Sequence, residues 1–435
     1  MQSKRIALTL AIVLMALAAM AQQAPAGPWH GKLSVGLQKL NLVFNFNADG
    51  TCTLDSPDQG AIGIAANTEV LRPDSVVVTV PSLGVRFAGS VAASTISGKF
   101  KQGAYTFHLT LRPGRVDVRR PQTPRPPFPY TTEDVRIPAG DAVLSATITY
   151  PEGYDSLRAA AAVPLVVLVS GSGLQNRDEE ILQHKPFAVI ADYLARRGIA
   201  TLRYDDRGFG MSTGSNDTAT TLTYADDAAA AVAFARGLGR FGRVGVLGHS
   251  EGGTIGFILG QRRVVDFVVS MAGAAERGLD ILLRQNRRAL AQAGMSEEVA
   301  DAYCHALEAV LESRELTDAM LTPLPAGLAD NLRGIAASPA VWLRYFAVYD
   351  PSAAIAATVC PVLALNGSRD TQVDAAANLG IIRNLLPGAD VREMPGLNHL
   401  MQHCARGTVD EYGSIEETVA PEVLSAIAWW IEKLE

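Results

Sequence analysis

Residues 243–253 read RVGVLGHSEGG, and the segments on either side of the central serine decide the fold. The short apolar run Val244–Leu247 predicts a buried strand, and GGTIGFIL at 252–259 predicts the start of a helix. Between a strand and a helix, a Gly-x-Ser-x-Gly pentapeptide holds its serine exposed on a tight, strained turn. Ser250 is therefore the predicted nucleophile, because a serine hydroxyl reacts readily only when it is so placed beside a base.

A second pentapeptide, GMSTG at 210–214, fits the same pattern. With 39 glycines in 435 residues, such a match arises by chance about one time in five, so the flanking sequence must decide. The residues after Ser212 read GSND, a polar turn with no helix to follow. Ser212 is therefore predicted to lie in a loop.

The segment from 22 to 111 has the alternation of β structure. Leu40, Leu42, Phe44 and Phe46 alternate with mostly polar residues, and a hairpin turn follows at 49–50. The same alternation returns at 105–111, with short strands predicted between. We expect a small antiparallel all-β domain, either a sandwich or a barrel. Two roles stay open for it: binding of a carbohydrate or partner, and packing or dimerisation.

Two further segments flank this domain. Residues 1–21 combine Lys4 and Arg5 with an apolar run and a small-residue cleavage pattern at 19–21, as a signal peptide does. The apolar run is too short to span a bilayer, so we expect a secreted or periplasmic protein without a stable membrane anchor. Residues 112–130 contain six prolines and five arginines, which predicts an extended, solvated linker.

From 131 to 435, strand-like runs alternate with helical patterns, which predicts a mostly parallel sheet covered on both faces. The expected strands are 163–170, 200–204, 244–247, 265–271, 360–365 and 391–394. The expected helices are 186–197, 224–238 and 419–434. Residues 275–350 show helical segments without strands, which indicates a helical insertion placed where a lid would cover the active site.

A serine nucleophile needs a base and an acid, and on such a sheet the expected order is serine, acid, histidine. His399 lies in the loop after the strand 391–394, and His403 is its rival four residues on. Asp370 lies in the loop after the strand 360–365, with Asp374 as the alternative. We expect Ser250, His399 and Asp370 to act together.

The oxyanion hole is expected to combine two backbone amides. One is the N–H of Glu251, directly after the nucleophile, and the other comes from SGSG at 170–173, after a predicted strand. We expect the N–H of Ser172 there, with Gly173 as the fallback. The charged runs at 177–180 and 205–207 are interpreted as a solvated helix start and as an ion-paired turn.

Composition excludes several other functions. The formal net charge of −6, without a basic stripe beside aromatic residues, argues against nucleic-acid binding. No phosphate-binding loop, dinucleotide fingerprint or metal-binding histidine motif is present, so we expect neither cofactor nor metal. Four cysteines allow three pairings; a bridge between Cys304 and Cys404 and buried free thiols both stay open. The oligomeric state is not predicted.

Together, GHSEGG at 248–253, DDRGFG at 205–210, SGSG at 170–173 and LNH at 397–399 resemble the α/β-hydrolase superfamily. Within it the chain is similar to bacterial secreted esterases that carry an N-terminal β module. The resemblance covers 131–435 and implies hydrolysis of a small-molecule carboxylic ester without metal or organic cofactor. Many members have a histidine before the oxyanion-loop glycine, where this chain has Ser170.

Two other functions remain open at this point. A peptidase or acyltransferase would use the same three residues, and only turnover of substrates separates these from an esterase. A noncatalytic binding protein, with the β domain as the working part, becomes attractive if Ser250, Asp370 and His399 do not meet in space.

Overall fold

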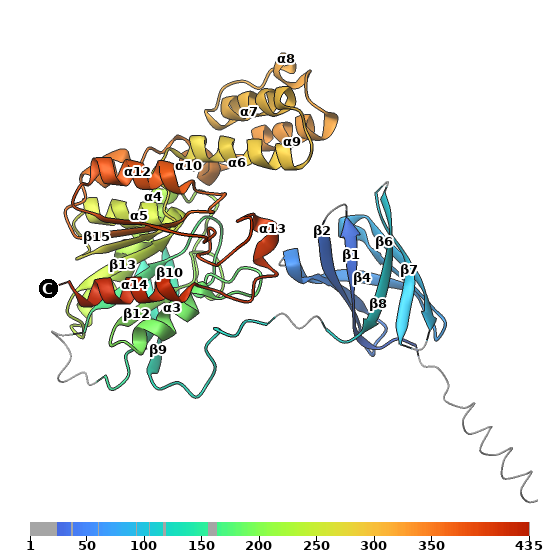
Figure 1. Ribbon diagram of the computed structural model, residues 1–435, viewed down its shortest axis with the longest axis horizontal. Coiled ribbons are helices and arrows are strands. Elements are labelled where there is room, and N and C mark those ends of the chain that lie inside the picture. Colours follow the sequence, from blue (N-terminus) through green and yellow to red (C-terminus); the bar gives the residue numbers. More distant parts are fainter. Residues whose placement is uncertain are drawn as a thin grey trace, which may run out of the picture. The chain divides into compact units, whose positions relative to one another are not determined.

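The computed structural model describes residues 24–35, 38–59, 61–92, 94–103, 105–115, 119–154 and 163–434. It divides into two compact units, Met1–Arg119 and Arg120–Glu435 (Figure 1). The expected signal segment at 1–21 lies outside the described residues. Within the described part of the chain, no helix combines the length and apolar character needed to cross a membrane.

The first unit is a closed antiparallel barrel, so of the two predicted forms the barrel is the one found. Its eight strands follow one another around the wall, and β1 closes the barrel by pairing with β8. The strands are β1 (Gly27–Val35), β2 (Gln38–Phe46), β3 (Cys52–Ser56), β4 (Ala61–Leu71), β5 (Ser75–Val80), β6 (Val85–Ala92), β7 (Thr95–Gln102) and β8 (Tyr105–Pro113). Two one-turn helices, η1 (Pro57–Gln59) and η2 (Pro81–Leu83), lie in the connections.

Alternation places every second side chain inside the barrel. Leu42, Phe44, Phe46, Phe87 and Leu109 are buried in this interior, and none is more than 4% exposed. The alternating pattern that predicted the β domain is therefore the pattern of its core.

The second unit is built on an eight-stranded sheet with the order β16-β15-β14-β13-β11-β12-β10-β9. The strands are β9 (Thr131–Ala139), β10 (Ala142–Tyr150), β11 (Leu165–Val169), β12 (Ala200–Tyr204), β13 (Val244–His249), β14 (Val268–Met271), β15 (Val362–Gly367) and β16 (Asp390–Met394). The six strands from β11 to β16 are parallel, and β9 and β10 add an antiparallel hairpin at one edge. The mostly parallel sheet is confirmed.

Helices cover both faces of this sheet, as Figure 1 shows. One face packs against α4 (Thr221–Gly237), α5 (Glu251–Gln261), α11 (Ser352–Ala356) and α12 (Ala375–Leu385). The other packs against α3 (Pro186–Ala195) and α14 (Pro421–Glu432). With both faces buried, the central strands are continuous apolar runs, which is why they could be located from sequence.

The expected helical insertion lies between β14 and β15. It comprises α6 (Gly278–Gln292), α7 (Glu297–Leu311), α8 (Asp318–Leu321), α9 (Ala326–Ala337) and α10 (Val341–Val348). These helices bury a small core of their own, which includes Leu279, Tyr303 and Leu332. The insertion is therefore a separately packed layer attached to the sheet.

The proline- and arginine-rich segment is not solvated throughout. Arg120 is only 8% exposed and donates to the carbonyls of Leu182, Gly413 and Ile415 at 2.8–2.9 Å. Gln122 donates to the carbonyl of Val419 at 2.7 Å. The expectation of a solvated linker is wrong for these residues, because composition does not reveal three carbonyls arranged around one guanidinium.

Candidate active site

Ser250 lies on a strained turn between β13 and α5. Its φ of 53° and ψ of −119° fall in a region that residues other than glycine rarely adopt. Its N–H donates to the carbonyl of Met271 at 3.0 Å, and its own carbonyl accepts from Gly253 at 2.9 Å. The strained turn predicted from sequence, called the elbow below, is present, and backbone hydrogen bonds on both sides of Ser250 hold it.

The two outer glycines of the pentapeptide are required by space. A Cβ at Gly248 would lie 1.9 Å from the carbonyl oxygen of Gly252, and one at Gly252 would lie 2.2 Å from the carbonyl oxygen of Val169. Any larger residue would push the helix away from the strand. The elbow geometry therefore explains the motif.

The structure brings Asp370 and His399 together. His399 Nδ1 donates to Asp370 Oδ2 at 2.7 Å, and both side chains are buried. The other carboxylate oxygen of Asp370 accepts the N–H groups of Gln372 and Val373 at 2.8 and 2.9 Å. The carboxylate is therefore held from both sides and fixes which imidazole nitrogen carries the proton.

The rival residues have other partners. The His403 imidazole is about half exposed and pairs with Glu417 and Glu422. Asp374 is the N-cap of α12 and accepts the N–H of Ala377 at 2.9 Å. Ser212 donates its hydroxyl hydrogen to the carbonyl of Asp205 at 2.7 Å. Each of the three therefore has a structural role of its own.

His249 links the elbow to the loop of His399. Its Nε2 donates to the carbonyl of His399 at 3.0 Å, and the two imidazole centroids are 4.8 Å apart. Its Nδ1 faces Glu179 Oε1 at 2.8 Å. A carbonyl and an ionised carboxylate only accept hydrogen bonds, so this geometry calls for a proton on each ring nitrogen. Burial alone would lower the pKa of His249, but its interactions with Glu179, with the carbonyl of His399 and with Asp370 together raise it.

Glu179 is the residue that the sequence interpretation placed wrongly. It is 3% exposed, whereas a solvated position was expected. Its Oε1 accepts both the His249 imidazole and the N–H of Gly171, each at 2.8 Å. Gly171 approaches the serine so closely that a Cβ there would lie 3.0 Å from the Cβ of Ser250. Glu179 therefore ties the SGSG loop to the elbow.

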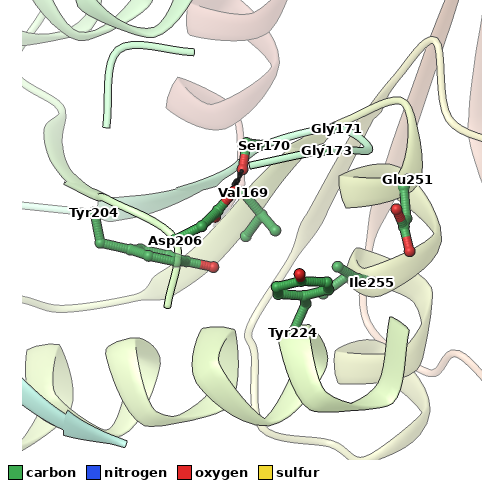
Figure 2. A pocket seen from close by; sticks show the side chains of 9 residues that line it. All are labelled: Val169, Ser170, Gly171, Gly173, Tyr204, Asp206, Tyr224, Glu251 and Ile255. Carbon is green, nitrogen blue, oxygen red and sulfur yellow. Dashed lines mark hydrogen bonds between the residues drawn. The ribbon is translucent and has the colours of Figure 1, made fainter. Parts of the chain in front are cut away.

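The SGSG loop is anchored on its other side by Asp206. Figure 2 shows the Ser170 hydroxyl directed at this carboxylate, to which it donates at 3.0 Å. Asp206 also accepts the N–H of Gln175 at 2.8 Å. Burial raises the pKa of Asp206 to about 7. Asp205 and Arg207 form the predicted ion pairs, with Arg177 and Asp227, but Asp206 instead holds the loop.

Glu251 joins the loop, the nucleophile and the insertion. Its buried carboxylate accepts from the Ser172 hydroxyl at 2.8 Å, from Thr221 at 2.7 Å and from the indole N–H of Trp342 at 3.0 Å. Figure 2 shows it on the first turn of α5, beside the cavity that Asp206 also lines. Burial raises the pKa of Glu251, and the three donors oppose that rise. Because Trp342 lies on α10, the insertion contacts the residue that follows the nucleophile.

The expected oxyanion donors are backbone N–H groups of Glu251 and of the SGSG loop, which the Ser172–Glu251 hydrogen bond joins. The N–H of Glu251 is the first of α5, and the first N–H groups of a helix have no partner within it. Ser172 is fixed through its hydroxyl, and Gly173 has a φ of +94°, which favours glycine. Which of the two loop amides faces the substrate stays a prediction.

All four thiols, which lie in the described part of the chain, are free, so the open alternative of a Cys304–Cys404 bridge is not realised. Among the described residues, no group of three or more His, Cys, Asp or Glu side chains is arranged to hold a metal ion.

The chain is similar in sequence to a known protein family and to a known esterase. The model of the Alpha/beta hydrolase family matches residues 166–411. Esterase EstD of Thermotoga maritima is 28% identical over 296 residues, which are 67% of this chain and 66% of that protein. The match thus spans about two thirds of the length of this curated relative.

Solved structures with low identity also align with the chain. Est1E from Butyrivibrio proteoclasticus, with ferulic acid bound, is 16% identical with a TM-score of 0.43, over 69% of this chain and 98% of that one. A proline iminopeptidase of Mycobacterium smegmatis is 19% identical with the same TM-score of 0.43, over 69% and 98%.

Proposed function

This chain belongs to the alpha/beta hydrolase family, and from that premise we propose that it is a serine carboxylic-ester hydrolase. The observation that carries the proposal is the pairing of His399 with Asp370 at 2.7 Å, in a loop bound through His249 to the strained turn of Ser250. A carboxylate, an imidazole and a serine on such a turn are the parts of a nucleophilic triad. The similarity to EstD favours ester substrates.

In the first half of the proposed cycle, Ser250 Oγ attacks the ester carbonyl carbon while its proton passes to His399 Nε2. Asp370 accepts the hydrogen bond from Nδ1 and stabilises the imidazolium. The carbonyl oxygen becomes an oxyanion, which accepts from the N–H groups of Glu251 and Ser172, with Gly173 as the alternative donor. The intermediate then collapses, and the alcohol leaves with the proton from His399.

In the second half, water attacks the acyl group on Ser250 and gives its proton to His399. The second oxyanion uses the same amides, and its collapse returns the proton to Ser250 and releases the carboxylic acid. Each proton therefore has a named donor and acceptor among the residues of this chain.

For the substrate, we propose short- to medium-chain acyl esters. The support is the helical insertion, whose Trp342 donates to the Glu251 carboxylate at 3.0 Å and so lies close to the residue that follows the nucleophile. We also propose that the protein is secreted or periplasmic, on the signal-like sequence at 1–21.

A substrate panel tests the esterase against the peptidase and acyltransferase alternatives. We expect hydrolysis of p-nitrophenyl acetate and butyrate, with kcat/KM falling for the palmitate. Aminoacyl p-nitroanilides should not be turned over, and added alcohols should not divert the acyl group. Faster turnover of the anilides would contradict the proposal in favour of a peptidase. No turnover of any of these compounds would favour a binding protein.

A further inference from the structure

The β-barrel contains a cavity that the proposed catalytic cycle does not use. Its volume is about 630 Å³, within the range of about 300–1,000 Å³ typical of small-molecule sites. Eight strands is also the barrel size at which side chains either fill the interior or leave room for one small ligand. This barrel does both, in different halves.

One half of the interior is filled. Phe44 lies against Phe46 and Phe87 with ring centroids 6.4 and 5.3 Å apart, and all three side chains are fully buried. Trp29 is also buried in this core. Aromatic packing therefore closes the cavity on this side.

The other half is open. The cavity-lining pairs Leu33–Leu40, Ser56–Ala61 and Gln102–Tyr105 stand opposite each other where β1 meets β2, β3 meets β4 and β7 meets β8. In an up-and-down barrel these connections lie at the same end. Tyr105 and Leu83 at this rim are 72% and 41% exposed, respectively. The cavity therefore opens at one end of the barrel and is closed toward the other.

The lining is apolar inside and uncharged at the rim. Its inner surface is made by leucine, isoleucine, valine and phenylalanine side chains, among them Leu42, Leu54 and Phe100. The polar lining residues are Ser56, Gln59, Gln102 and Tyr105, and no described lining residue carries a charge at neutral pH. Gln102 donates to the carbonyl of Leu83 at 3.2 Å, and Ser56 donates to Gln59 at 2.7 Å.

We propose that the barrel is a second binding site, which takes one small molecule made of an alkyl chain with an uncharged polar head. The chain enters the apolar cavity and the head stays among the amides and hydroxyls of the rim. An anionic head would find no cation in this lining, and leaving a charge unpaired there is costly. A sugar would find mostly aliphatic walls, so of the roles considered for the β domain this cavity does not suit carbohydrate.

Binding is measured with the full-length chain and the uncharged fluorophore N-phenylnaphthylamine, which brightens in apolar surroundings. Hexanol, octanol and decanol are then used to displace it, with octanoate at pH 8 as the charged counterpart. Each methylene that enters an apolar cavity strengthens binding by about fourfold, so octanol should bind about fifteenfold more tightly than hexanol. Octanoate should bind at least tenfold more weakly than octanol.

Two variants on one strand locate the site. Ala61 lines the cavity near its mouth, whereas Ala65, four residues along β4, faces outward and is exposed. Ala61→Trp should weaken fluorophore binding at least tenfold, and Ala65→Trp should leave it unchanged. Ala61→Leu fills less of the cavity and should weaken decanol more than hexanol, which keeps the test valid if the larger variant does not fold.

The following results would overturn the proposal. They are an absence of fluorophore binding in the natural chain, equal binding by the Ala61→Trp and Ala65→Trp variants, or octanoate binding as tightly as octanol. A fluorophore held in the active-site cleft would survive Ala61→Trp and would count as the second of these results. None of the readouts depends on ester hydrolysis, so the outcome is independent of the proposed catalytic function.

Discussion

The barrel cavity and the surroundings of Ser250 are lined by different kinds of groups. Inside the barrel the described cavity lining is uncharged, and the room left between side chains is its working feature. Around Ser250, Glu179, Asp206 and Glu251 are buried with their hydrogen-bond partners, and they hold a loop and a strained turn in place. The barrel cavity is formed by the packing of uncharged side chains, whereas buried carboxylates and their hydrogen bonds hold the segments around Ser250. Replacing one of these charges isosterically should therefore change the activity of the α/β unit or the pH dependence of its stability, and adding a charge to the cavity should weaken binding in the barrel.

The largest effect is expected at Asp370. Asp370→Asn keeps the shape but removes the charge that stabilises the imidazolium of His399, so kcat for p-nitrophenyl butyrate should fall about 10³–10⁴-fold. Asp374→Asn is the matched control, because asparagine also caps a helix and Asp374 binds Ala377 instead of an imidazole. Equal rates for the two variants would remove Asp370 from the proposed triad.

Asp206 should make stability depend on pH. Its pKa is about 7 in the folded chain and ordinarily 3.8, so between these pH values the folded state binds the proton more strongly and stability falls as pH rises. Because asparagine does not titrate, Asp206→Asn removes this loss of stability at higher pH. Relative to the natural chain, its free energy of unfolding should rise by about 2–4 kcal/mol between pH 4 and pH 7.5.

Urea unfolding at the two pH values measures this difference, and Asp226→Asn is the control, because Asp226 forms an ion pair with Arg262. An Asp206→Asn difference that stays constant with pH would show that this carboxyl is already ionised near pH 4.

Glu179→Gln should slow catalysis about 10- to 100-fold through misplacement of the loop and elbow. A single oxygen of Glu179 accepts hydrogen bonds from both Gly171 and His249. A neutral His249 that keeps its hydrogen bond to the His399 carbonyl has no proton on Nδ1, so it cannot donate to the glutamine oxygen of the variant. The raised pKa of His249 means that it loses its proton at a higher pH than an ordinary imidazole does, and without the Glu179 charge this loss should occur at a lower pH. The alkaline limb of the kcat profile should therefore move to lower pH in Glu179→Gln.

Glu180→Gln is the control for that profile, because Glu180 contacts Lys185 on the surface. An unchanged alkaline limb in Glu179→Gln, with only a lower rate at every pH, would mean that Glu179 supports the loop without controlling the proton on His249.

The smallest effect is expected in the barrel. Gln102→Glu adds one charge at the rim and removes the donor to the carbonyl of Leu83, so octanol should bind about threefold more weakly, or about 0.7 kcal/mol. Fluorophore displacement measures the change. Tighter octanol binding in Gln102→Glu would contradict an uncharged mouth.

What could be predicted from sequence follows the same division. Strands with both faces buried, such as β11 and β13, are apolar runs, and the barrel strands alternate with period two, so both left a local signal. The hairpin of β9 and β10 was not located, because half-exposed β9 lacks an apolar run. Asp370 and His399 could be proposed because the expected order of serine, acid and histidine points to the loops after two predicted strands, and the structure pairs these two side chains.

The support around these residues left no such signal. Glu179 stands in a charged run that resembles a solvated helix start, and its partners Gly171 and His249 are 8 and 70 positions away. Trp342 meets Glu251 across 91 positions. A cavity is a property of how side chains fill a closed barrel, and alternation predicts the barrel without its volume. Contacts of this kind depend on tertiary packing, which a linear pattern does not encode locally.

The central claim is that Ser250 is an activated nucleophile, and covalent labelling tests it most directly. The full-length protein is treated with a fluorophosphonate, digested, and its adduct located by mass spectrometry. The account expects one adduct on the peptide that contains Ser250, lost in Ser250→Ala, kept in Ser212→Ala and formed much more slowly in Asp370→Asn. An adduct on another serine, or no adduct on folded protein, would contradict it.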